Sequence, residues 1–78
     1  MGVEIAALMR QVGPHLFRFS LRSNGEVDVA YVAGRFGGGG HTGAAGFEME
    51  GDPEVLKRTF IQAAAESLKR NANPVEPQ

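Results

Sequence analysis

Apolar and polar residues alternate along two segments near the start of the chain. Residues 15–22 alternate strictly, with apolar side chains at Phe17, Phe19 and Leu21, and a period of two predicts a β-strand with one buried face. Residues 3–10 alternate less regularly and contain good helix formers, so both a strand and a helix remain open there. Because Gly13-Pro14 predicts a turn between them, an antiparallel hairpin is the simplest arrangement.

Apolar spacing then changes to the helical period. Val29, Val32, Ala33 and Phe36 occupy positions i, i+3, i+4 and i+7, which predicts a short helix. Asp28 precedes this segment, and its carboxylate can accept hydrogen bonds from the free N–H groups of a first helical turn. The glycines that follow Phe36 are expected to end this helix.

The last third of the chain predicts one more strand and one longer helix. Residues 45–50 alternate again and are expected to form a third strand. Asp52-Pro53 is a helix start signal, and apolar residues recur every four positions after it, at Leu56, Phe60, Ala64 and Leu68.

The predicted elements assign the chain to the α+β class. We expect a small sheet of three or more strands, formed by the hairpin and the third strand, with two helices packed on one face. Residues 1–70 make one domain, and residues 71–78, rich in Asn, Pro and Glu, are expected to form a disordered tail.

Composition restricts the classes of function. The 78 residues include no cysteine, so a disulfide framework and a thiolate metal site are excluded. Apolar runs are too short for a membrane helix, and we expect a soluble cytoplasmic protein without membrane contact. The net charge of −1 argues against a broad nucleic-acid groove. Residues 10–41, however, contain four arginines and only two carboxylates, and this local excess of positive charge is compatible with an anion site.

The candidate chemistry lies in residues 37–41, four glycines followed by His41. Glycines let a ligand approach the main chain and can turn several N–H groups towards one anion, and phosphate is the usual ligand of such a surface. The spacing matches neither a P-loop nor a dinucleotide-binding fingerprint. The residues alone leave a phosphate-binding loop and a close-packed turn equally open.

Several motifs together resemble a known family. Residues 36–41 (FGGGGH) and 44–47 (AAGF), preceded by 20–23 (SLRS) and 27–29 (VDV), resemble the C-terminal DHH-associated domain of DHH phosphoesterases, such as oligoribonucleases and phosphoadenosine-phosphate phosphatases, over about residues 3–70. The resemblance implies that this chain binds the phosphate or nucleotide part of a substrate. It assigns that role to the following residues: Arg22, Gly37, Gly38, Gly39, Gly40 and His41.

The resemblance also places catalysis outside this chain. Hydrolysis by two divalent ions needs grouped carboxylates and histidines, and the sequence contains no Asp-His-His motif and no set spaced for a metal. The family's metal centre, holding manganese or another divalent ion, lies in an N-terminal DHH catalytic domain, which is therefore the implied partner. We expect no catalytic residue here, with at most an assisting role for His41, and no cofactor bound by this chain. Whether the native protein is an enzyme stays open at this point.

Three functions remain in competition. The substrate is a short RNA, short DNA or related nucleotide, including a linearised cyclic dinucleotide; or it is inorganic polyphosphate; or the domain is a non-enzymatic interaction or dimerisation module, as in the related domain of alanyl-tRNA synthetase. A homo-oligomer is left open. His15 and Arg18 are expected to be surface residues without a ligand role, and Tyr31 is either exposed or covered by a partner domain.

Overall fold

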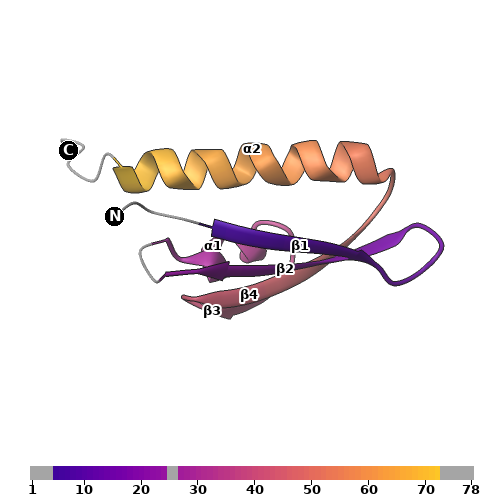
Figure 1. The fold of residues 1–78 in the computed structure, drawn as a ribbon, viewed down its shortest axis with the longest axis horizontal. Helices are drawn as coiled ribbons and strands as arrows, with labels where there is room; N and C mark the ends of the chain where they lie inside the picture. The colour runs from indigo at the N-terminus through magenta and orange to yellow at the C-terminus, as the bar shows by residue number, and fades with distance from the viewer. Residues whose placement is uncertain (1–4, 25–26, 73–78) are drawn as a thin grey trace.

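A computed structural model describes residues 5–24 and 27–72 of the chain. The elements in chain order are β1 (Ile5–Gln11), β2 (Leu16–Ser23), α1 (Val29–Gly34), β3 (Gly39–His41), β4 (Ala44–Glu50) and α2 (Pro53–Ala72). Figure 1 shows α2 running along one side of the sheet. The α+β class is confirmed. Of the two interpretations that the sequence left open for residues 3–10, the strand is correct and the helix is wrong.

The described strands form one antiparallel sheet in the order β1-β2-β4-β3. The hairpin of β1 and β2 and the strand β4 confirm the expected strands. The short strand β3, which contains the second half of the glycine run, was not expected. Because β4 lies between β2 and β3, the glycine run pairs with β4 and does not contact β2 through its backbone.

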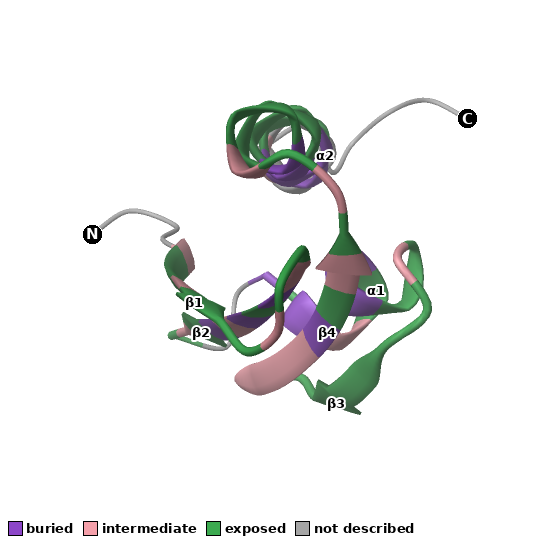
Figure 2. Cartoon of the chain, turned by 90° about the vertical axis from the view of Figure 1, so that its right-hand side faces the viewer, coloured by how far each residue is buried: buried purple, intermediate pink, exposed green. Residues whose placement is uncertain are grey.

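The core lies on one face of this sheet. Phe17, Phe19 and Leu21 of β2 are buried with Phe47 of β4, and residues of both helices complete the same cluster. The Phe19 and Phe47 rings stack with centroids 4.6 Å apart. Figure 2 shows the buried residues concentrated between the sheet and the helices. The expectation that both helices pack on one face is therefore confirmed.

Two aspartates begin the helices as the sequence predicts. Asp28 Oδ1 accepts hydrogen bonds from the backbone N–H groups of Ala30 at 3.0 Å and Tyr31 at 3.3 Å. Asp52 Oδ2 accepts from the N–H of Val55 at 3.2 Å. Each carboxylate satisfies donors that have no intrahelical partner.

The end of α2 differs from the expectation. The helix continues to Ala72, so the first two residues of the expected tail, residues 71 and 72, are helical. The helical hydrogen-bond pattern continues there although the apolar repeat ends at residue 68, which is why periodicity alone placed the boundary too early. Residues 73–78 lie outside the described part of the chain. No helix within the described ranges is long and apolar enough to cross a membrane.

Candidate anion-binding site

The face of the sheet opposite the helices, here called the open face, carries the candidate site. It consists of the even-numbered residues of β1, β2 and β4, together with Gly39 and His41 of β3, because cross-strand partners share a face. All of these residues are described, and none of them is buried. Figure 2 shows β3 as exposed and β4 as largely intermediate. No described helix covers this face.

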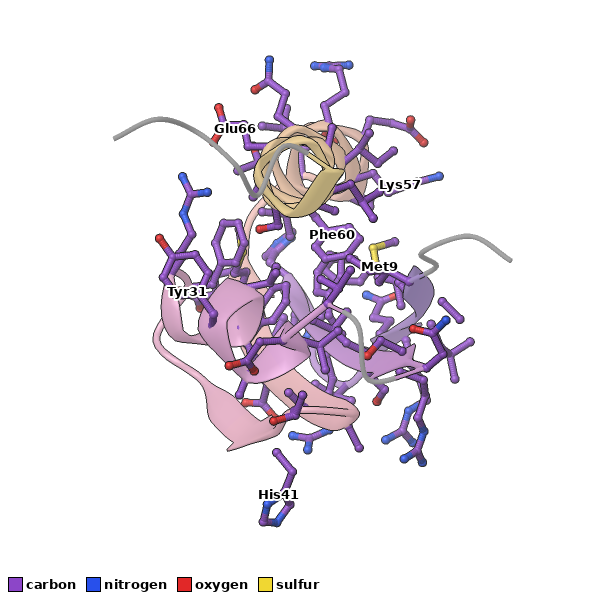
Figure 3. The ribbon with its side chains drawn as sticks, turned by 90° about the vertical axis from the view of Figure 1, so that its left-hand side faces the viewer. Met9, Tyr31, His41, Lys57, Phe60 and Glu66 are labelled. Carbon is purple, nitrogen blue, oxygen red and sulfur yellow. The ribbon has the colours of Figure 1, made fainter. Side chains whose placement is uncertain are left out.

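His41 and Arg22 lie in one cross-strand row on the open face. His41 pairs with Ala44 of β4, and Ala44 pairs with Arg22 of β2. Two such steps separate the Cα atoms of His41 and Arg22 by about 10 Å. Both side chains are exposed, and neither forms a hydrogen bond or ion pair with any described residue. Figure 3 shows His41 pointing away from α2.

The turn after His41 is tied to the end of β2. The Ser23 N–H donates to the Gly43 carbonyl at 3.1 Å, and the Val29 N–H donates to the Thr42 carbonyl at 3.0 Å. Ser23 Oγ also donates to the Val27 carbonyl at 2.7 Å. These bonds hold the turn of the β3-β4 hairpin against the strand end that carries Arg22. Ser23 followed by Asn24 is a usual turn-forming signal, but local sequence does not indicate that Ser23 bonds to the carbonyls of Val27 and Gly43.

The first glycine of the run closes the turn that follows α1. Gly37 has φ +86°, a left-handed conformation that disfavours other residues. The Gly38 N–H donates to the Ala33 carbonyl at 2.9 Å, and the Gly37 N–H donates to the Gly34 carbonyl at 3.1 Å. This pair of bonds is the Schellman motif. The helix itself ends at Gly34, earlier than the end at Arg35 or Phe36 that the sequence predicts, and Gly37 and Gly38 complete the turn that follows it.

The second and third glycines of the run meet opposite surroundings. A Cβ atom at Gly38 would lie 2.6 Å from the Phe47 Cβ and collide with the Gly46 carbonyl oxygen, so only glycine fits against β4 there. A Cβ atom at Gly39 would meet nothing within 4 Å. Gly39 lies on the open face, two residues before His41 and opposite Gly46. Packing therefore explains Gly38 and does not explain Gly39.

The backbone N–H groups of the run do not converge as the sequence analysis anticipated. Those of Gly37 and Gly38 are bonded to carbonyls of α1. Antiparallel pairs alternate between bonded and non-bonded positions, which pairs Gly39 and His41 with β4 and directs the N–H of Gly40 to the free edge of β3. The run therefore provides a flat floor without side chains rather than a concave group of free donors.

Arg18 and Arg10 add charge further along the open face. Arg18 Nη1 lies 3.2 Å from Glu48 Oε2, with both side chains 45% exposed. Arg10 pairs with Arg18 in the β1-β2 register and forms no ion pair with a described residue. The expectation that Arg18 is a surface residue agrees with its half-exposed position.

Two other candidates lie away from the row. His15 is exposed and precedes β2 in the turn between β1 and β2, which agrees with its expected position. Tyr31 is exposed on α1, on the helix side of the sheet.

The described residues do not form a metal centre. They contain no group of three or more His, Cys, Asp or Glu side chains that could hold an ion.

The fold and the open face define a class of protein: a small α+β domain whose uncovered sheet face exposes the guanidinium of Arg22 and the imidazole of His41. Comparison with family models is consistent with this class, because the DHHA1 domain model matches residues 1–70. The chain belongs to the DHHA1 family. DHHA1 is the C-terminal domain associated with DHH-family phosphoesterases, and it is typically attached to an N-terminal DHH domain.

Proposed function

We propose that this domain holds a phosphate of a short oligonucleotide or related nucleotide and presents it to a metal centre outside this chain, within a cytoplasmic DHH-family phosphoesterase. The observation that carries the proposal is the row on the open face, where His41 and Arg22 flank Ala44 and both side chains lack a protein partner among the described residues. Unpaired polar side chains on one uncovered face are available to a ligand.

The chemistry of the two side chains suits a phosphate. The Arg22 guanidinium offers donors in a planar fork that matches two phosphate oxygens. His41 can donate a hydrogen bond from the other side of the same group. The small Ala44 lies between them, and Gly46 with Gly39 in the neighbouring row adds no side chain beyond hydrogen, so the phosphate can approach the sheet.

The proposal gives this chain a role in binding and not in cleavage. Phosphoester hydrolysis requires a nucleophile and charge stabilisation at the leaving oxygen, which the family obtains from its metal centre. Arg22 and His41 position the phosphate, and the chain alone is expected to be inactive.

Titration of a 5′-phosphorylated RNA dinucleotide into the isotope-labelled chain tests the proposal. We expect the backbone signals of Arg22 and of residues 37–42 to shift first. Arg22→Gln and His41→Ala should each weaken binding at least about tenfold, because each removes a hydrogen bond to a charged group worth roughly 1.5–3 kcal/mol. Calorimetry measures the affinities.

Matched controls exist on the same chain. Arg58→Gln removes an exposed arginine from α2, and His15→Ala removes the other histidine; both should bind like the unaltered chain. Full affinity in the Arg22 and His41 variants, or shifts confined to the acidic residues 48–54, would contradict the proposal and favour an interaction module.

A further inference from the structure

A shallow hollow lies beside Arg22 on the part of the open face formed by β1 and β2. It has a volume of about 370 Å³ and is lined by Ala6, Ala7, Leu8, Ser20 and Arg22. A second hollow of about 270 Å³ shares Ala6 and Arg22 and extends towards the end of β2. The larger hollow has the size of small-molecule sites in proteins, which occupy roughly 300–1,000 Å³.

The side chains around the larger hollow alternate in size. Ala6 pairs with Arg22 and Leu8 pairs with Ser20, so two large side chains stand on one diagonal and two small ones on the other. Diagonal neighbours are about 7–8 Å apart. This spacing admits one planar ring between Leu8 and Arg22, since optimal van der Waals contact requires about 3.5–4.0 Å on each side.

The lining residues have no other evident partner. Leu8 is 64% exposed and does not belong to the core cluster. The Ser20 side chain lines the hollow, and its hydroxyl forms no hydrogen bond with a described residue. The Arg22 guanidinium is planar and can stack on a ring.

We propose that this hollow binds a nucleobase, so that the domain selects nucleotides over base-free polyphosphates. The inference rests on the proposed function, because it uses the phosphate held between Arg22 and His41. Arg22 then lies between the phosphate and the base of one nucleotide. The phosphate occupies the β4 side of Arg22 and the base occupies its β1 side, each about one strand spacing of 4.8 Å away.

The experiment compares ligands that differ only in the base. Calorimetry with adenosine monophosphate and ribose 5-phosphate, which carry the same phosphate, should show the first binding at least about fivefold tighter, the lower end of what stacking a base contributes. Leu8→Ala should remove most of this preference and leave the affinity for ribose 5-phosphate unchanged. Leu8→Phe should increase the preference because an aromatic ring stacks better than an aliphatic chain.

Val12→Ala is the matched control, since Val12 is an exposed apolar residue outside the hollow. Its preference should equal that of the unaltered chain. Equal affinity for the two ligands, or unchanged preference in both Leu8 variants, would overturn the base site while the phosphate site stands. Absence of binding by both ligands and by tripolyphosphate, with no shift at Arg22 or His41, would instead overturn the proposed function.

Discussion

Three adjacent glycines, Gly37, Gly38 and Gly39, differ in the structural constraint at each position. Gly37 requires a left-handed backbone, and Gly38 lies against β4 where a methyl group has no room. Gly39 has an ordinary conformation and free space around it. Folding therefore does not require glycine at position 39. Because Gly39 lies close to His41 on the open face, a substitution there tests whether ligand binding requires a glycine.

We expect Gly38→Ala and Gly39→Val to separate folding from binding. Gly38→Ala should lower the free energy of unfolding by about 2 kcal/mol or more through overpacking. Gly39→Val should melt like the unaltered chain but bind the dinucleotide at least about tenfold more weakly, because its side chain fills the floor beside His41. Thermal melting and calorimetry measure the two effects. Full dinucleotide affinity in Gly39→Val would show that the ligand does not use this floor.

At the scale of elements, alternation and helical spacing predicted β2, β4 and both helices, because each buries apolar side chains at regular intervals. They did not predict β3, since glycines carry no apolar pattern. Arg22 and His41 were identified as candidates through the family resemblance. Their common row depends on β4 lying between β2 and β3, and this order is set by long-range pairing that local patterns do not encode.

The cap of α1 is a second testable element. Asp28→Ala should destabilise the domain by about 1 kcal/mol, because two N–H groups lose their acceptor. For a domain of this size the melting temperature should fall by about 4–8 °C. Asp28→Asn, which keeps a capping oxygen, should melt within a degree or two of the unaltered chain. Equal losses in both variants would indicate that the carboxylate charge, and not the cap, stabilises α1.

At the scale of the whole molecule, the nearly neutral chain has no large excess of positive charge, so attraction of an anion depends on a few local side chains. The net charge is −1, and the proposed phosphate site holds one guanidinium and one imidazole. Binding of a short single strand should therefore depend weakly on salt, with a slope of log affinity against log salt between about −0.7 and −1.4 for one or two neutralised phosphates.

Calorimetry over a salt series measures that slope. Arg22→Gln should reduce its magnitude by about 0.7 and Arg58→Gln should leave it unchanged. A slope steeper than about −3 would mean that the ligand contacts a wider basic surface, including Arg10 and Arg18, and would contradict a site of two residues.

Arg22 and His41 are brought together only by β4, which separates them in the sheet and follows both in the chain. Because this pairing depends on long-range strand order, a molecule that engages both residues should bind the folded form in preference to the unfolded form. Such a molecule shifts the folding equilibrium by mass action, by about 2.7 kcal/mol at a hundred times its dissociation constant. This contribution is comparable to that of burying one large apolar side chain, about 1.5–3 kcal/mol, so a bound substrate would measurably raise the melting temperature of the domain.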